Sequence, residues 1–95
     1  MEKHVFRLFV AGHSARSDRA IANLRAMCET YLTGRYHLDI VDVSADPAAA
    51  EAEKIVATPT LVKERPRPVR RIIGDLSDQQ EALRDLDVPP EVPDS

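Results

Sequence analysis

The segment Val5-Phe6-Arg7-Leu8-Phe9-Val10-Ala11 is nearly all apolar and is followed by Gly12. Such a run is typical of a β-strand covered on both faces, as at the centre of a layered α/β sheet. Apolar residues then recur with a period close to 3.6, which predicts a helix that Ser14 or Ser17 can cap and Gly34 can end. The recurring positions are Ala20, Ile21, Leu24, Met27, Cys28, Tyr31 and Leu32.

A second strand is predicted over Tyr36 to Val43, so that strand, helix and strand form a right-handed βαβ unit with parallel strands. Asp46-Pro47 predicts a helix start, because a carboxylate caps well and proline fits the first helical position. The residues up to Lys54 favour a helix but bury little, and only Ile55 and Val56 offer large apolar groups. We therefore expect this helix to be weakly anchored.

The last third of the chain predicts an antiparallel hairpin and a final helix. A third strand begins at Thr58-Pro59-Thr60-Leu61-Val62, a turn follows at Pro66-Arg67-Pro68, and a fourth strand runs from Val69 to Ile73. Ser77-Asp78 predicts the start of a helix over residues 77–86. The order βαβ, α, ββ, α predicts an α/β fold of the thioredoxin-like class with a mixed four-stranded sheet. In that fold a cis proline opens the third strand, and Pro59 stands at this position.

Composition indicates one small globular domain: the chain has 95 residues, 43% of them apolar and 31% charged. We expect residues 1–88 to form the domain and residues 89–95 to form a flexible, proline-rich and acidic tail. A net charge of −3 does not favour nucleic acid as a partner. No apolar run reaches the roughly 20 residues of a membrane span, and the N-terminus lacks the apolar region of a signal peptide. A cytoplasmic location is therefore expected, with no membrane partner.

The residues predict no catalytic, cofactor-binding or metal-binding site. Redox proteins of this fold carry Cys-x-x-Cys just after the first strand, but Gly12-His13-Ser14-Ala15-Arg16-Ser17 contains no thiol. Cys28, the single cysteine, excludes an internal disulfide and fits a buried hydrophobe on the helix. His4, His13 and His37 lack metal-ligand spacing. An enzyme is not expected, and a thioredoxin-fold redox enzyme is the least favoured interpretation.

One charge cluster lies on the predicted hairpin, where five of nine residues are basic: Lys63, Arg65, Arg67, Arg70 and Arg71. Charge and proline on an edge strand can protect it against aggregation. The same residues can also form a docking surface for an acidic partner, since arginine orients such contacts. Nucleic acid is less favoured, because no aromatic residue interleaves with the basic ones.

Three segments carry a resemblance to a known family. They are Leu8-Phe9-Val10-Ala11-Gly12, Ala57-Thr58-Pro59-Thr60-Leu61 and Val69-Arg70-Arg71-Ile72-Ile73-Gly74-Asp75-Leu76-Ser77. Through them the chain resembles the KaiB family, from about residue 5 to about residue 87. The resemblance implies a non-enzymatic protein that binds the hexameric ATPase KaiC, helps to capture KaiA and displaces a sensor kinase. It also implies fold switching, between a ground state that is usually tetrameric and a thioredoxin-like monomer that binds KaiC.

The resemblance also implies where the partner would bind. By register with the family, Lys54 and Arg19 lie at or near the KaiC-facing surface, and Arg70 and Arg71 match the family's basic pair. Glu51 is grouped with them, either as part of the contact or as a neighbour that pairs with Lys54 three residues along a helix. The alternative for Lys54 is thus a solvated, locally paired side chain.

The sequence departs from the family near its end. Asp85 replaces a glycine of the family pattern, Asp87 adds a further charge, and Pro89 and Pro90 close the segment. Aspartate and proline disfavour a strand, whereas the preceding residues favour a helix. We therefore expect the thioredoxin-like state to dominate in a mainly monomeric protein, with a tetramer or dimer as the alternative.

Together these features predict a KaiB-like clock or signalling protein. It would bind a KaiC-type ATPase through its thioredoxin-like state and regulate the phosphorylation cycle or output of that ATPase, with a KaiA-like protein or a sensor histidine kinase as further partners. The alternative is a sensory or adaptor domain that acts on a histidine kinase or a stress pathway and is not rhythmic.

Overall fold

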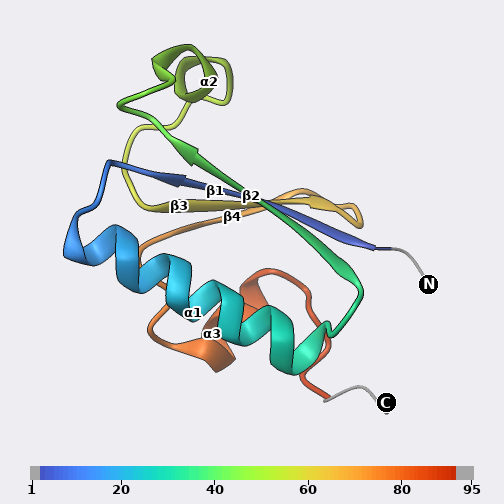
Figure 1. Ribbon diagram of the computed structural model, residues 1–95. Helices are drawn as coiled ribbons and strands as arrows, with labels where there is room; N and C mark the ends of the chain where they lie inside the picture. The colour runs from blue at the N-terminus through green and yellow to red at the C-terminus, as the bar shows by residue number, and fades with distance from the viewer. Residues whose placement is uncertain (1–2, 92–95) are drawn as a thin grey trace.

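Strand β1 (His4–Val10) lies inside a four-stranded sheet whose order is β2-β1-β3-β4. The structure is a computed structural model and describes residues 3–91 (Figure 1). The other elements are α1 (Ala15–Tyr31), β2 (Tyr36–Asp42), α2 (Pro47–Ala52), β3 (Thr60–Arg65), β4 (Arg70–Ile73) and α3 (Gln79–Asp85). Strand β2 is parallel to β1, whereas β3 and β4 add in antiparallel fashion. The predicted element order and the mixed sheet are both confirmed.

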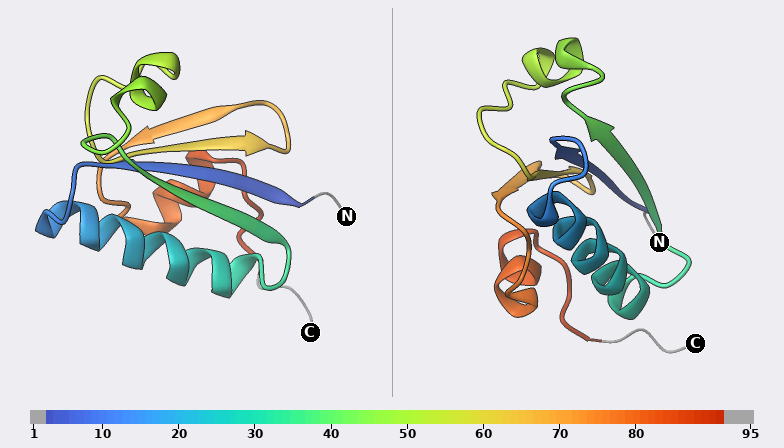
Figure 2. Two further views of the ribbon diagram at one scale, coloured as in Figure 1. Left: turned by 45° about the horizontal axis from the view of Figure 1, so that its top comes forward. Right: turned by 60° about the vertical axis from the view of Figure 1, so that its left-hand side comes forward.

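Helices α1 and α3 cover one face of this sheet, and α2 lies on the other side, near one end (Figure 2). Alternation along β1 directs Phe6, Leu8 and Val10 toward α1 and α3, and all three belong to the hydrophobic core. Leu24, Met27, Leu61, Leu83, Leu86 and Val88 complete much of that core. The core is mainly aliphatic, as expected for a chain with two Phe and no Trp.

Helix α1 begins where the sequence offers its first serine. Ser14 is the N-cap, and its Oγ accepts a hydrogen bond from the Ser17 backbone N at 3.1 Å. The helix ends at Tyr31, and the Leu32 backbone N donates to the Cys28 carbonyl at 2.8 Å. Gly34, with φ of 71°, lies in the turn that follows and does not itself end the helix.

The second face of β1 is covered only in part. Phe9 is fully buried there, with the Arg7 guanidinium 5.2 Å from the centre of its ring. Arg7 itself and Val5 are half-buried. The prediction of a strand covered on both faces therefore holds at Phe9 and only in part at Val5 and Arg7.

Helix α2 is short and buries no residue, which confirms that it is weakly anchored. Asp46 caps it by accepting a hydrogen bond from the Ala49 backbone N at 3.2 Å, and Pro47 follows at the first helical position. The helix ends at Ala52, two residues before the predicted end at Lys54. Lys54 has φ of 55°, a left-handed conformation that cannot continue a right-handed helix.

The hairpin of β3 and β4 begins after a cis peptide bond between Thr58 and Pro59, the position where the sequence predicts one. The Arg65–Pro66 and Arg67–Pro68 bonds in the hairpin turn are also cis. Strand β3 itself starts at Thr60, two residues later than predicted.

Helix α3 occupies Gln79–Asp85, inside the predicted range of residues 77–86. Its cap is Asp78, whose carboxylate accepts a hydrogen bond from the Glu81 backbone N at 3.1 Å. Val88 is still part of the core, whereas residues 89–91 are exposed. The remainder of the predicted tail, residues 92–95, lies outside the described residues.

Candidate partner-docking surface

The position after β1, where redox members of this fold carry their thiols, is occupied by hydroxyl groups. Ser14 Oγ and Ser17 Oγ lie 2.9 Å apart, and Ser17 Oγ also accepts a hydrogen bond from the Ala11 backbone N at 3.3 Å. The Gly12 backbone N donates to the Asp42 carboxylate at 3.0 Å, which joins the ends of β1 and β2. These groups fix the turn into α1 and include no nucleophilic sulfur.

Cys28 lies in the core, where its side chain is fully buried. Burial raises the pKa of the thiol to about 12, and the nearby Glu29 charge acts in the same direction. A thiol with so high a pKa carries almost no thiolate at neutral pH, and thiolate is the reactive form. Among residues 3–91 there is also no cluster of three His, Cys, Asp or Glu side chains that could hold a metal ion.

Lys54 occupies the segment that leaves α2. Its backbone N donates to the Glu51 carbonyl at 3.1 Å, which closes the turn, and its side chain is exposed. Its ammonium forms no ion pair with any residue that the structure describes, Glu51 included. The alternative interpretation is met in part, since the side chain is solvated, but its contact with Glu51 runs through the two backbones and not through an ion pair.

Glu53, next to Lys54, joins α2 to the sheet. Its carboxylate lies 3.4 Å from Arg7 Nη1 on β1 and 3.6 Å from Arg71 Nη2 on β4. Arg71 also donates a hydrogen bond to the Glu53 carbonyl. Arg71 thus holds the end of α2 against the open face of the sheet, a role that its place in the sequence did not indicate.

Arg19 and Arg70 are likewise engaged within the chain. Arg19 Nε donates to Asp75 Oδ2 at 3.2 Å, and Arg70 Nε donates to Asp87 Oδ2 at 2.9 Å. Asp75 further accepts from the Ser77 backbone N at 3.1 Å. The hydrogen bond from Arg19 is the main cause that holds the pKa of Asp75 below its ordinary value. Arg19 therefore ties the turn after β4 to α1, and Arg70 ties the segment after α3 to the start of β4.

Lys63 corrects the sequence interpretation of the hairpin cluster. The register pairs Lys63 with Phe6 and with Arg70, on the same side of β3 as the core residue Leu61. Only 1% of its surface is exposed, so it belongs neither to a docking surface nor to a protected edge. Desolvation by burial lowers the pKa of its ammonium. Arg65 and Arg67 remain exposed, as the cluster interpretation requires.

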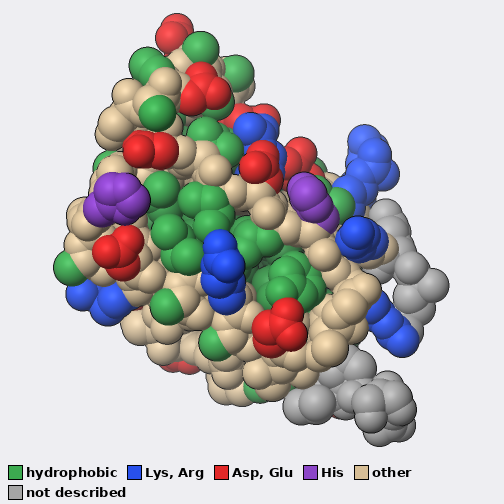
Figure 3. All heavy atoms as spheres, in the orientation of Figure 1, with side chains coloured by type: hydrophobic (Ala, Val, Ile, Leu, Met, Phe, Trp, Pro, Cys, Tyr) green, Lys and Arg blue, Asp and Glu red, His purple; other side chains and the backbone are tan. Residues whose placement is uncertain are grey.

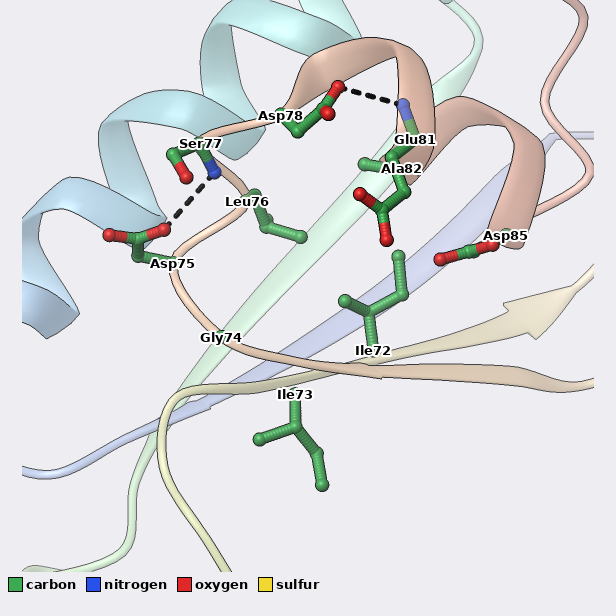
Figure 4. A pocket seen from close by; sticks show the side chains of 10 residues that line it. All are labelled: Ile72, Ile73, Gly74, Asp75, Leu76, Ser77, Asp78, Glu81, Ala82 and Asp85. Atoms are coloured by element: carbon green, nitrogen blue, oxygen red, sulfur yellow. Dashed lines mark hydrogen bonds between the residues drawn. The ribbon is translucent and has the colours of Figure 1, made fainter.

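Two pockets lie near the predicted site residues. One, of about 150 Å³, lies between β4 and α3, where Figure 4 shows the side chains of Glu81 and Asp85 directed toward Ile72. Its other carboxylates serve local structure, because Asp75 and Asp78 accept backbone hydrogen bonds within the turn and the helix cap (Figure 4). The second pocket, of about 210 Å³, lies beside α2 and is lined by Val43, Ala50, Ile55, Val56, Ala57 and Thr58.

The surface around α2 combines charge with apolar groups. Figure 3 shows acidic and hydrophobic side chains side by side at the top, where α2 lies in Figure 1. Val56, in the segment between α2 and β3, is 90% exposed, the largest fraction among the exposed large apolar residues of the described chain. Neither Val56 nor Glu53 was assigned to the site from the sequence, although a large apolar residue two positions after Lys54 was a usable signal.

Lys54, Glu51 and Arg71 therefore lie around the end of α2, with Arg71 reaching that end through Glu53. Arg19 and Arg70 lie instead at two contacts of the C-terminal half. The sequence-predicted residues do not form one contiguous cluster, and the candidate docking surface is the α2 region (residues 50–58 with Arg71).

A thioredoxin-like fold without the thiols of its redox members defines the class of this protein. A family model described as the KaiB domain matches residues 7–88, and the chain belongs to the KaiB family.

The chain is similar to clock proteins over most of its length. It is 46% identical to circadian clock protein KaiB3 of a Synechocystis strain, over 96% of this chain and 89% of that protein. It is 49% identical to the circadian clock oscillator protein KaiB of a Prochlorococcus marinus strain, over 90% of this chain and 71% of that protein.

Solved structures support the fold. The N-terminal domain of Synechococcus elongatus SasA superposes with a TM-score of 0.72, at 23% identity, over 97% of this chain and 90% of that one. Mitochondrial thioredoxin 3 of Saccharomyces cerevisiae superposes with a TM-score of 0.70, at 19% identity, over 90% of this chain and 81% of that one. These likenesses confirm the predicted thioredoxin-like fold. In the described part of the chain, no helix has the length and hydrophobicity of a membrane span.

Proposed function

We propose that this protein is a non-enzymatic clock or signalling protein that binds a KaiC-type ATPase through its thioredoxin-like state. Binding would regulate the phosphorylation cycle or output of the ATPase, in the cytoplasm. A KaiA-like protein or a sensor histidine kinase would be a further partner. Membership of the KaiB family and the similarity to clock oscillator proteins support this proposal.

The exposed ammonium of Lys54 is the observation that carries the proposal. Lys54 has no intramolecular counter-ion among residues 3–91, and its left-handed backbone is fixed by the bond to Glu51. An exposed cation without an internal counter-ion orients and accelerates the approach of an acidic partner. Arg71 on β4 stabilises the same surface through its ion pair and hydrogen bond with Glu53.

A binding measurement with the purified ATPase ring from the same source tests the proposal. Lys54→Glu is expected to weaken binding by at least about tenfold, which corresponds to about 1.4 kcal/mol. The loss should shrink as salt is added, because exposed charges are screened. Arg25→Glu on the exposed face of α1 is the matched control, since it makes the same charge reversal away from α2.

Reversal of Arg70 and Arg71 needs a second readout, because both side chains also hold the fold together. We expect the double reversal to weaken binding and to lower thermal stability, whereas Lys54→Glu should affect binding alone. Equal binding by the wild type and the Lys54 variant would place the contact elsewhere. If the wild type fails to bind any KaiC-type ATPase but captures a histidine kinase, the adaptor alternative holds.

A further inference from the structure

The pocket beside α2 is an apolar recess at the proposed docking surface. It lies between Val43, which follows β2, Ala50 on α2, and the segment from Ile55 to Thr58 that leads into β3. Its volume is about 210 Å³. A buried cavity of about 150 Å³ is large enough for benzene, so this open recess has room for an aliphatic side chain.

Two hydrogen bonds within the chain restrain the wall of this pocket, one to α2 and one at the start of β3. At one end the Ile55 backbone N donates to the Ala50 carbonyl at 2.9 Å. At the other end Thr60 Oγ1 donates to the Ala57 carbonyl at 2.7 Å. Between these two bonds Val56 projects into solvent and is 90% exposed. A fixed segment that presents an apolar side chain loses little conformational freedom on binding, which favours affinity.

Charge beside the pocket indicates what accompanies the aliphatic group. Lys54 is two residues from Val56 and has no intramolecular carboxylate partner in the described chain. The neighbouring Glu53 carboxylate is turned toward the sheet, where it ion-pairs with Arg71 and with Arg7, an arginine that also contacts Asp39 and Glu64. Glu51 is the remaining anion on this segment, and its charge repels any carboxylate that a partner brings to Lys54.

We infer that the pocket beside α2 takes an aliphatic side chain of a partner protein, with a partner carboxylate seated against Lys54. This inference rests on the proposed function. The contact on the KaiC-type ATPase would be a surface segment in which an aliphatic residue and an acidic residue are neighbours. The apolar contact excludes water around the ion pair, which strengthens it.

Affinity for the ATPase ring, measured at about 0.1 M and about 0.5 M salt, separates the two components. Val56→Ser is expected to weaken binding at least about fivefold at both salt concentrations, because the contact is apolar. Lys54→Gln should weaken binding at low salt and much less at high salt. Glu51→Gln should have the opposite effect and strengthen binding at low salt, because it removes a charge that repels the partner carboxylate.

Two variants make the result specific to the pocket. Ala50→Leu places a larger side chain in the recess, and leucine is compatible with helix α2. This variant is expected to weaken binding, as Val56→Ser does. Val69→Ser, at a 55% exposed position on the hairpin, removes the same apolar group elsewhere and should leave affinity unchanged. Circular dichroism of each variant excludes a folding defect as the cause.

The outcomes distinguish this inference from the proposed function. If the wild type binds the ATPase and both Val56→Ser and Ala50→Leu bind equally well, the pocket is not the contact and the inference is overturned, while the proposed function stands. If Glu51→Gln weakens binding, the partner group at Lys54 is not a carboxylate. If the wild type does not bind, both fall together.

Discussion

Arg70 donates a hydrogen bond to Asp87 at 2.9 Å, across the gap between the start of β4 and the segment after α3. The sequence predicts the first residue as a partner contact and the second as a determinant of the fold. The two residues are ion-paired in this structure, so that a cation at the start of β4 contacts the segment that follows α3 in the thioredoxin-like arrangement. Asp87 has φ of 55°, which aspartate tolerates better than most residues.

A double-mutant cycle on this pair tests its contribution to stability. Arg70→Ala, Asp87→Asn and their combination are expected to give a coupling energy of about 0.2–1 kcal/mol in urea unfolding, because both groups are about half exposed. High salt should reduce it. Arg67→Ala, which removes an exposed arginine outside this pair, is the control. Additive effects of the two single variants would show that the pair does not stabilise the fold.

The dominant fold of the isolated protein is a second prediction. We expect a mainly monomeric protein in which residues 79–85 are helical at rest, as α3 is here. The free-energy difference between two folds of one chain is only a few kcal/mol, so the capped helix and the disfavoured strand at Asp85, Asp87 and Pro89 decide it. Backbone NMR shifts and sedimentation measure both properties. A strand signature across residues 83–88 in a tetramer-sized particle would contradict the prediction.

Asp75 provides a pH-dependent prediction. Its pKa in the folded protein lies below the ordinary 3.8, mainly because Arg19 donates to its carboxylate. A depressed folded-state pKa means that the stabilisation is complete above about pH 4 and is lost as pH falls through the folded-state value. In an NMR titration, we expect the Asp75 midpoint below 3.8 in the wild type and a higher midpoint in Arg19→Ala. Equal midpoints in the two proteins would show that Arg19 does not act on this carboxyl.

Lys63 gives a prediction of the opposite sign. Burial lowers the pKa of its ammonium below the ordinary 10.5 in the folded state. The unfolded chain then binds the proton more tightly, so the buried charge lowers stability at pH 7 and this cost disappears as pH rises toward 10.5.

Lys63→Met keeps the length and the apolar stem of the side chain and removes the charge. We expect the variant to melt at a higher temperature than the wild type at pH 7, with a smaller difference at pH 10. Arg65→Met, at an exposed neighbour, should show no such pH-dependent difference. A lower melting temperature for Lys63→Met at pH 7 would contradict the prediction and show that the buried ammonium stabilises the fold.

Cys28 is expected to be chemically inert in the native state. With a pKa of about 12 and no exposed surface, it should react with a thiol reagent at pH 8 only as fast as the protein opens, and quickly in urea. The protein should not accelerate the reduction of insulin by dithiothreitol. An acceleration that Cys28→Ser abolishes would establish a redox activity.

Local sequence signals determined the elements and their order. The apolar run of β1, the 3.6-residue period of α1 and the Asp46-Pro47 start of α2 each follow from short-range chemistry, because strand alternation, helix period and capping need only nearby residues. The weak anchoring of α2 followed as well, since its residues carry no large apolar side chains. These features fix the thioredoxin-like layout before any long-range contact is known.

The role of each charged side chain depends on long-range contacts that the fold creates. Arg19, Arg70 and Arg71 looked alike as exposed cations, yet the acidic residues that they contact lie 56, 17 and 18 residues away. Lys63 looked like another surface cation, but its pairing with Phe6 turns it into the core. A register shift of one residue moves every side chain of a strand to the other face, and register depends on the partner strand. The resemblance to the family indicated Lys54 as a contact, and the fold leaves its ammonium without an ion pair among residues 3–91.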